Sequence, residues 1–215
     1  MKSSSRIIIV DYRLGNLFSI QQALSSAGFQ CTVSASPEDL LNADGIILPG
    51  VGAFGDAMSE LRQRGLVDAL REAAVSGIPI LGICLGMQLL FDHSEEFGFH
   101  QGLSLLPGRV VRLPEQHESG RRLRIPNVGW NQVTRHDPEK HSEILNGIPD
   151  ETHMYFVHSY FVQPDDPSMT LLQAEYGSIC YCCAVQNENI LGVQFHPEKS
   201  GPSGIQLCRN WANQI

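Results

Sequence analysis

The chain has 215 residues, a formal net charge of −8 at pH 7 and six cysteines. A chain of this length can bury enough apolar surface to fold as one α/β domain without disulfides. Its acidic balance and the lack of any long Lys/Arg run argue against nucleic acid or an anionic membrane as the main partner.

The cysteines are expected to be reduced. Only four consecutive apolar residues, at positions 7–10, precede Asp11, and this is too short for the apolar region of a secretory signal. Thiols of cytoplasmic proteins are normally kept reduced. We therefore expect a cytoplasmic location and no structural disulfide.

The first half of the chain alternates apolar runs with segments of helical periodicity. Runs at 6–10, 31–34, 45–48 and 78–83 predict buried parallel strands. The intervening segments predict helices, because they carry apolar residues at helical spacing, a Ser-Pro start or a glycine stop. They are residues 16–27, 36–39 and 53–76, the last with two helical pieces. This alternation predicts a mostly parallel sheet with helices on both faces.

After about residue 102 the runs become shorter and are separated by turn-like breaks. Mixed or antiparallel strands are predicted at 108–113, 154–161, 170–176, 179–186 and 190–194. The basic cluster at 121–124 is interpreted as a solvated loop or rim, and contact with a partner or a phosphate is the alternative. A capping box at 203–206 predicts the last helix, which would bury Ile205, Cys208 and Trp211. The fold class is thus a single α/β domain with additional antiparallel strands in its C-terminal half.

Cys84 lies in the run Gly82-Ile83-Cys84-Leu85-Gly86, after a predicted strand and before a helical stretch. Glycines two residues to either side of a reactive side chain are typical of a nucleophile elbow, here with Cys in place of Ser. Such a turn places the sulfur at a helix N-terminus, where partial positive charge favours the thiolate over a free thiol of pKa about 8.5. Cys84 is therefore predicted to be a nucleophile.

His196 and Glu198 follow the predicted strand at 190–194. A cysteine hydrolase needs a base within hydrogen-bond reach of the sulfur and a third group that orients the base. If this strand ends at the sheet edge where the elbow emerges, both side chains lie above that edge. Taken alone, a histidine or a cysteine is more often part of a core, but their conjunction predicts a catalytic triad of Cys84, His196 and Glu198.

Acyl transfer also requires hydrogen-bond donors for the oxyanion. One is expected from the Leu85 N–H, which directly follows the nucleophile. Another is expected from Val51 or Gly52, in the loop after the third strand, because glycines there permit unusual backbone angles. Residues 50–55 also match the dinucleotide pattern G-x-G-x-x-G, but the match follows the third strand rather than the first, so no cofactor is predicted.

Two other clusters have simpler interpretations. The run Cys180-Tyr181-Cys182-Cys183 lacks the ligand spacing of a zinc site and is interpreted as a strand with small packing residues. No metal is predicted. His158 is an alternative base, and is interpreted as part of a pocket wall or of the core.

Taken in order, these motifs resemble a known family. The matching blocks are residues 11–17, 48–54, 80–88, 129–131, 155–160 and 194–200. They are similar to motifs of class I (triad) glutamine amidotransferases, and within that family to the glutaminase subunits of imidazole glycerol phosphate synthase. The resemblance identifies residues 6–215 as one glutamine amidotransferase type 1 domain. Arg13 stands where glycine is common in the family, and Asn127-Val128 where His-Met is usual.

The resemblance implies that Cys84 attacks the side-chain amide of glutamine, that His196 transfers protons and that Glu198 orients His196. It also implies contacts with bound glutamine from a set of pocket residues, which are Gly52, Gln88, His158, Ser159 and Tyr160.

The resemblance further implies a heterodimer with a (β/α)8-barrel cyclase subunit. Ammonia would pass to the cyclase, which makes imidazole glycerol phosphate and an aminoimidazole carboxamide ribotide in histidine biosynthesis. Residues implied at or near the interface are Asn16, Trp130, Tyr155 and Lys199.

Three alternatives differ in what they require. A paralogous glutaminase would supply ammonia for amidination of a surface sugar. A nucleotide-binding oxidoreductase needs an acidic ribose ligand after a glycine fingerprint at the first strand, and residues 11–15 provide none. A catalytically inactive scaffold would be expected to have lost a triad member, and none is lost.

Overall fold

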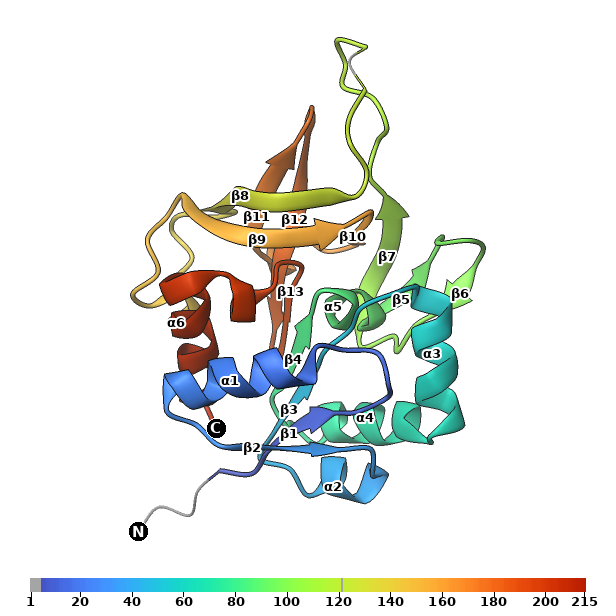
Figure 1. Ribbon diagram of the computed structural model, residues 1–215, viewed down its shortest axis with the longest axis vertical. Helices are drawn as coiled ribbons and strands as arrows, with labels where there is room; N and C mark the ends of the chain where they lie inside the picture. The colour runs from blue at the N-terminus through green and yellow to red at the C-terminus, as the bar shows by residue number, and fades with distance from the viewer. Residues whose placement is uncertain (1–4, 121) are drawn as a thin grey trace.

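The computed structural model describes residues 5–120 and 122–215, which form one mixed sheet of thirteen strands with helices packed on it (Figure 1). Five strands run parallel in the order β2-β1-β3-β4-β13. In that order their bounds are Cys31–Ser34, Ile7–Val10, Gly45–Leu48, Ile80–Ile83 and Ile190–Val193. The predicted parallel half of the sheet is confirmed.

Burial on both faces explains why these strands have continuous apolar sequences. Every residue of β1, β3, β4 and β13 is buried. Alternate side chains of β1 enter two separate cores: Ile8 and Val10 pack with the helices on one face of the sheet, and Ile7 and Ile9 pack with the helices on the other face. Because successive side chains of a strand point to opposite faces, each buried strand contacts helices on both faces of the sheet.

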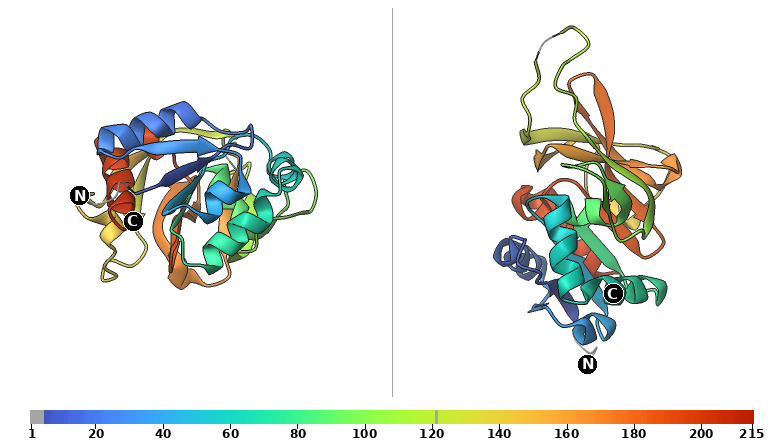
Figure 2. Two further views of the ribbon diagram at one scale, coloured as in Figure 1. Left: turned by 90° about the horizontal axis from the view of Figure 1, so that it is seen from below. Right: turned by 90° about the vertical axis from the view of Figure 1, so that its right-hand side faces the viewer.

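Helices cover both faces of this parallel region (Figure 2). One face carries α1 (Leu17–Ala27) and α6 (Gly201–Ala212). The opposite face carries α2 (Pro37–Leu41), α3 (Phe54–Gln63), α4 (Leu66–Val75) and α5 (Leu85–Leu89). Helix α1 ends at Gly28, whose φ of 97° lies in the left-handed region that favours glycine, as its position predicted.

The start of α6 differs from its prediction. The helix begins at Gly201 after Ser200, so Ser203 lies inside the helix and forms no capping box. The chain already turns in η3 (Pro197–Lys199) just before it, which starts the helix earlier than the Ser-Gly-Ile-Gln pattern suggested. Cys208 and Trp211 are buried as predicted, but Ile205 is only half-buried.

The other strands are antiparallel to their neighbours, apart from β5 and β7, which pair in parallel. Their bounds are β5 Phe91–Ser94, β6 His100–Gln101, β7 Leu106–Arg112, β8 Asn127–Arg135, β9 Thr152–His158, β10 Tyr160–Pro164, β11 Thr170–Tyr176 and β12 Ile179–Asn187. Short 3-10 turns lie at η1 (Glu143–Leu145) and η2 (Pro167–Met169).

The prediction of a single strand at 154–161 was wrong. The segment divides at Ser159, because β9 pairs with β8 whereas β10 pairs with β7 and β12. This change of partners turns β9 away from β10. The ribbon of β8 and β9 stays joined to the sheet through β11 and lies above α1 and α6 in Figure 1. It thereby forms one wall over the carboxyl ends of the parallel strands.

The chain between β7 and β8 projects away from the body of the molecule (Figure 1). Arg122 and Arg124 are exposed there, as predicted for a solvated rim; Arg121 of the same cluster lies outside the described residues. All six cysteines are free thiols, and Cys180-Tyr181-Cys182-Cys183 is part of β12, as predicted.

Candidate active site

Cys84 stands at a sharp turn between β4 and α5, in a conformation that few non-glycine residues adopt. Its φ is 56° and its ψ is −112°. Strain of this kind costs about 1–3 kcal/mol and persists only where the surroundings hold the residue in place. Here the Cys84 N–H donates to the Val193 carbonyl of β13 at 2.7 Å. The turn has the form of the elbow predicted from the sequence.

Two glycines allow α5 to approach the sheet this closely. A Cβ at Gly86 would lie 1.8 Å from the carbonyl oxygen of Leu48 on β3. A Cβ at Gly82 would lie 2.9 Å from the carbonyl oxygen of Gly86. Because backbone atoms cannot move aside as a flexible side chain can, the glycine spacing is required by the packing of helix on strand.

His196 and Glu198 stand at the start of η3, a 3-10 turn where the sequence predicted a loop. The His196 Nδ1–H donates to Glu198 Oε1 at 2.8 Å, and both side chains are buried. Since Nδ1 is engaged by Glu198, Nε2 is the nitrogen available to interact with Cys84. The structure thus brings together the three residues of the predicted triad.

The charge on His196 is set by its two partners. Burial alone lowers its pKa, but hydrogen bonds and electrostatic attraction to Cys84 and Glu198 outweigh this and raise the pKa to about 10. Among the described residues, Glu198 Oε2 is buried without a hydrogen-bond partner, so the imidazolium is the main compensation for this carboxylate. At neutral pH His196 is therefore positively charged and suited to pair with a thiolate.

A cavity of about 270 Å³ opens in front of Cys84 and His196. Its wall contains all the residues predicted to contact the oxyanion or the substrate, which are Val51, Gly52, Leu85, Gln88, His158, Ser159 and Tyr160. They come from three separate segments of the chain, 51–52, 85–88 and 158–160, gathered at the carboxyl ends of the parallel strands. This is the edge at which open α/β sheets bind ligands.

Glu96 lies in the cavity wall although the sequence analysis missed it. Its Oε2 accepts a hydrogen bond from the Phe54 N–H, at the start of α3, at 2.6 Å. Burial raises the Glu96 pKa above its ordinary value, against the opposing effects of the Phe54 N–H and of His100. No sequence signal distinguishes Glu96 from Glu95, because its place depends on how the segment after β5 meets α3.

His158 lies in the cavity wall as predicted, but its ring nitrogens are both occupied. Nδ1–H donates to the Tyr160 carbonyl at 2.9 Å, and Nε2 accepts from the Tyr181 hydroxyl at 3.1 Å. Burial, together with repulsion from His196, lowers the His158 pKa to about 4 although the Tyr160 carbonyl opposes the shift. A neutral ring with both nitrogens engaged does not serve as the base.

Three of the four residues predicted at a partner interface lie on the face around the cavity. The register of β8 and β9 pairs Trp130 with Tyr155 and Val128 with Val157. We call these four residues the apolar ribbon face; Trp130 is 53% exposed and Val128 52%. Lys199, which also lines the cavity, holds its Nζ 5.8 Å from the centre of the Tyr155 ring.

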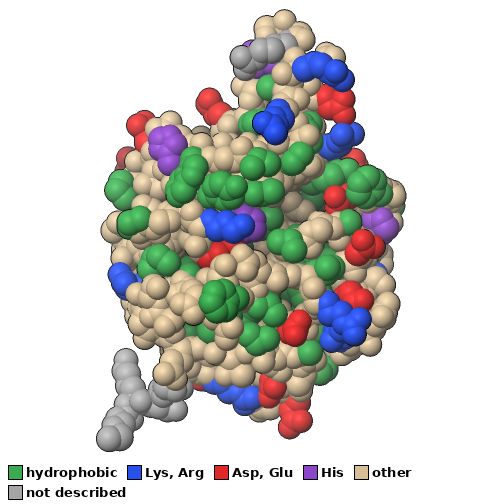
Figure 3. Space-filling view, in the orientation of Figure 1, with side chains coloured by type: hydrophobic (Ala, Val, Ile, Leu, Met, Phe, Trp, Pro, Cys, Tyr) green, Lys and Arg blue, Asp and Glu red, His purple; other side chains and the backbone are tan. Residues whose placement is uncertain are grey.

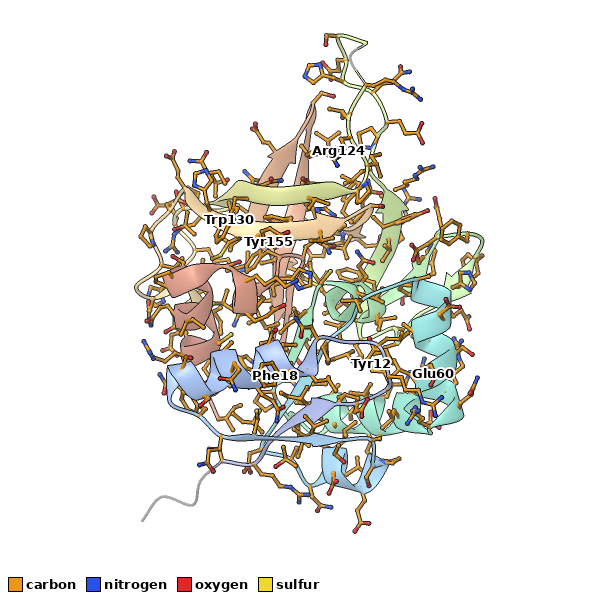
Figure 4. All side chains as sticks on the ribbon, in the orientation of Figure 1. Tyr12, Phe18, Glu60, Arg124, Trp130 and Tyr155 are labelled. Carbon is orange, nitrogen blue, oxygen red and sulfur yellow. The ribbon has the colours of Figure 1, made fainter. Side chains whose placement is uncertain are left out.

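Figure 3 shows apolar side chains gathered over β8, β9 and α1 around basic side chains, and Figure 4 places Trp130 and Tyr155 above Phe18 of α1. Phe18 is 69% exposed and was not predicted here. The fourth predicted residue, Asn16, caps α1 by accepting the Ser19 N–H at 3.4 Å. An exposed apolar surface of this kind is typical of a protein interface.

Within residues 5–120 and 122–215, no group of three or more His, Cys, Asp or Glu side chains is arranged to hold a metal ion. In the same part of the chain, no helix has the length and apolar character needed to cross a membrane.

Solved structures that are similar in fold include PurLQS and a glutaminase domain. The chain matches the structure of PurLQS from Thermotoga maritima with a TM-score of 0.72 and 20% identity, over 99% of each chain. It matches the Trypanosoma brucei CTPS glutaminase domain with bound acivicin with a TM-score of 0.63 and 20% identity, over 97% of this chain and 94% of the other. At these identities the likeness concerns the fold.

Sequence relatives are much closer. Proteins named imidazole glycerol phosphate synthase subunit HisH are 44% identical in Syntrophotalea carbinolica, over 96% of this chain and 99% of that protein, and 46% identical in Moorella thermoacetica, over 97% and 95%. The HisH subunit of Desulfitobacterium hafniense is 48% identical, over 96% and 94%. The family model "Glutamine amidotransferase class-I" matches residues 8–215. The resemblance seen in the motifs is confirmed: the chain belongs to the class I glutamine amidotransferases and, within them, to the family of imidazole glycerol phosphate synthase HisH subunits.

Proposed function

We propose that this chain, as one domain over residues 6–215, is the glutaminase subunit of imidazole glycerol phosphate synthase. It hydrolyses glutamine to glutamate and ammonia in the cytoplasm. The ammonia passes to a (β/α)8-barrel cyclase subunit that makes imidazole glycerol phosphate and an aminoimidazole carboxamide ribotide. The observation that carries the proposal is the placement of Cys84, His196 and Glu198 together beside one cavity, in a chain related over nearly its whole length to HisH subunits.

The reaction proceeds in two halves. The Cys84 thiolate attacks the side-chain carbonyl carbon of glutamine, and the C–N bond breaks as His196 gives its proton to the departing nitrogen, which leaves as ammonia. Water then attacks the glutamyl thioester while His196 takes a proton from it, and glutamate leaves as the C–S bond breaks. Glu198 holds Nδ1 protonated throughout, so that Nε2 always faces the sulfur.

The oxyanion of each tetrahedral intermediate needs two donors. The Leu85 N–H follows the nucleophile and lies in the cavity wall. The second donor is the N–H of Val51 or Gly52. If the Gly50–Val51 peptide turns its carbonyl toward the site, this donor is lost, and a cost of about 3 kcal/mol lowers the rate more than a hundredfold.

The surroundings of this loop support a switch at Val51. The Tyr12 hydroxyl donates to the Pro49 carbonyl at 2.6 Å, and a Cβ at Gly50 would lie 2.8 Å from Leu85 Cβ, so the first half of the loop is tightly held. Val51 is 42% exposed, and a Cβ at Gly52 would meet no atom within 4 Å. Ligand binding on the cyclase turns this free half of the loop and starts the glutaminase.

Substrate recognition requires a partner for each charged end of glutamine. The Glu96 carboxylate is held in the cavity wall by the Phe54 N–H and receives the α-ammonium group. Gln88 and the segment from His158 to Tyr160 also line the cavity and contact the remaining polar atoms. Because the amino-acid end is bound away from Cys84, the side-chain amide is the group presented to the sulfur.

The apolar ribbon face, with Phe18 and Lys199, forms the surface that docks on the cyclase. Val157 and Lys199 of this surface also line the cavity from which ammonia leaves. A neutral ammonia molecule reaches a second active site only if water is kept from the route, and packing of an apolar rim on the partner provides this exclusion. Asn16 supports the surface by capping the first turn of α1, next to Phe18.

The test is copurification with a cyclase subunit, followed by measurement of glutamate release with and without the ribotide substrate. We expect slow release from the isolated chain, at least a hundredfold stimulation in the complex with ribotide, and loss of release in Cys84→Ala. Fast release that is indifferent to partner and ribotide would contradict the proposed control. Glutamate release without ribotide turnover in any such complex would favour the surface-sugar paralogue instead.

A further inference from the structure

Gln194 is a fully buried polar side chain to which neither the motifs nor the mechanism above gave a role. It directly follows β13, and its exposed fraction is 0%. Its main-chain N–H donates to the Cys183 carbonyl at 2.8 Å, so the backbone is fixed by the sheet. A buried amide is costly unless its donors and acceptor are used, and the partners of this side chain therefore matter.

The side-chain amides of Gln88 and Gln194 form a chain of hydrogen bonds that ends at the nucleophile. Gln88 Nε2 donates to the Tyr160 carbonyl at 2.9 Å and to Gln194 Oε1 at 2.9 Å. Gln194 Nε2 in turn donates to Cys84 Sγ at 3.7 Å.

The direction of donation along this series of hydrogen bonds is fixed at its Tyr160 end. A main-chain carbonyl only accepts hydrogen bonds, so the nitrogen of Gln88 must face Tyr160. The second N–H of that nitrogen then requires an acceptor from Gln194, which turns the Gln194 nitrogen toward the sulfur. The orientation of Gln194 as a donor therefore does not depend on a free choice between its oxygen and nitrogen.

We infer that Gln194 is a catalytic residue whose side-chain N–H stabilises the Cys84 thiolate and connects the sulfur to the substrate-binding wall through Gln88. The inference rests on the proposed function, because the thiolate matters where Cys84 is the nucleophile. The sulfur also lies 3.7 Å from the Val157 carbonyl, which accepts only from the protonated thiol. The two contacts favour opposite forms of Cys84, and Gln194 shifts the balance to the anion.

Several ionisable groups also face the sulfur or its cavity from the surrounding elements. They are His196, with Glu198 behind it, on η3; Tyr12 after β1; His158 and Tyr160 of β9 and β10; and Glu96 and Lys199 in the cavity wall. All of them are retained when Gln194 is replaced. A difference between the pH profiles of the parent and a Gln194 variant therefore measures the effect of the Gln194 side-chain amide on Cys84.

The test is the pH dependence of Cys84 alkylation by iodoacetamide, measured by mass mapping so that reaction at the exposed Cys180 is counted separately. The full chain is compared with Gln194→Met, Gln88→Met and, as a matched control, Gln163→Met on β10, where Gln163 Oε1 accepts from Arg109. Loss of one hydrogen bond to a charged group raises the midpoint in Gln194→Met by roughly one pH unit, a tenfold smaller thiolate population. Gln88→Met moves it much less, and Gln163→Met leaves it unchanged.

A midpoint unchanged in Gln194→Met, or moved equally in Gln88→Met, overturns the inference. If Gln194→Met does not fold, the double variant Gln88→Met/Gln194→Met is compared with Gln88→Met, since replacing both amides leaves no unpaired donor between them. The same shift is expected in that comparison. Glutamate release by the parent is assayed in parallel: a shifted midpoint without glutamate release refutes the proposed function alone, and release without a shift refutes the role of Gln194 alone.

Discussion

His158 gives folding a dependence on pH that the structure fixes in sign and size. Burial, with repulsion from His196, lowers its pKa from 6.5 to about 4 against the effect of the Tyr160 carbonyl. Below pH 6.5 the unfolded chain binds a proton at this residue and the folded chain does not, until about pH 4. The stabilisation is therefore complete above pH 6.5 and is lost as the pH falls to about 4.

The size of the loss follows from the two pKa values. Their difference, 6.5 minus about 4, is about 2.5 pH units. At 1.36 kcal/mol per unit, this corresponds to roughly 3 kcal/mol of unfolding free energy. His196, whose pKa is raised to about 10, acts in a different window: its stabilisation is complete below pH 6.5 and is lost as the pH rises to about 10. His196 therefore adds no pH dependence to the free energy of unfolding below pH 6.5.

The assay is urea unfolding of the parent chain and of His158→Gln at a series of pH values between about 7.5 and 4. Glutamine can still donate to the Tyr160 carbonyl and accept from Tyr181, but it does not titrate in this range. Carboxylates are common to both chains, so the difference between the two curves isolates His158. We expect the parent to lose up to about 3 kcal/mol more than the variant. Parallel curves would refute the reasoning.

Three other substitutions test separate parts of the structure. Arg13→Gly should raise the free energy of unfolding by about 1 kcal/mol in urea titrations, because Arg13 has a φ of 74°; no gain would mean that the arginine side chain compensates the strain. Gly86→Ala should destabilise the fold by about 3 kcal/mol or more, measured by thermal unfolding, because its Cβ would lie 1.8 Å from the Leu48 carbonyl oxygen; a stable variant would contradict the elbow packing. Trp130→Ala should weaken cyclase binding at least about thirtyfold in calorimetric titration, as for a central aromatic anchor, and unchanged affinity would place the interface elsewhere.

The parallel half of the fold was readable from the sequence because burial on both faces leaves continuous apolar runs. The run at 45–48 coincides with the fully buried β3. The strand predicted at 31–34 also coincides with β2, although this edge strand is only partly buried. The run at 78–83 was too long, since β4 begins only at Ile80, after Pro79. In contrast, β8 (Asn127–Arg135) was missed, because its outward face is exposed and its sequence is largely polar. Its pairing with β9 and β11 depends on contacts that no local pattern records.

The candidate site was also only partly predictable from the sequence. Residues whose role follows from their chemical type and motif, such as Cys84 and His196, were predicted by number. Glu96 and Gln194 were assigned no role, because each acts through a neighbour brought to it by the fold, the Phe54 N–H and the Cys84 sulfur. Arg13 shows the reverse case: family members commonly have glycine there, and the φ of 74° supplies the physical reason for that preference.

The register between β4 and β13 is what joins the two distant parts of the site. The last residues of the two strands are paired, so Cys84 and Gln194 leave the sheet side by side. One step back in the register Gly82 is paired with Gly192, and α5 covers both: a Cβ at Gly192 would lie 2.7 Å from Met87 of that helix. A slip of one residue would place a larger side chain under α5 and turn the strand's side chains to the wrong faces. The two glycines therefore fix both the helix at the nucleophile and the strand alignment that delivers its partners.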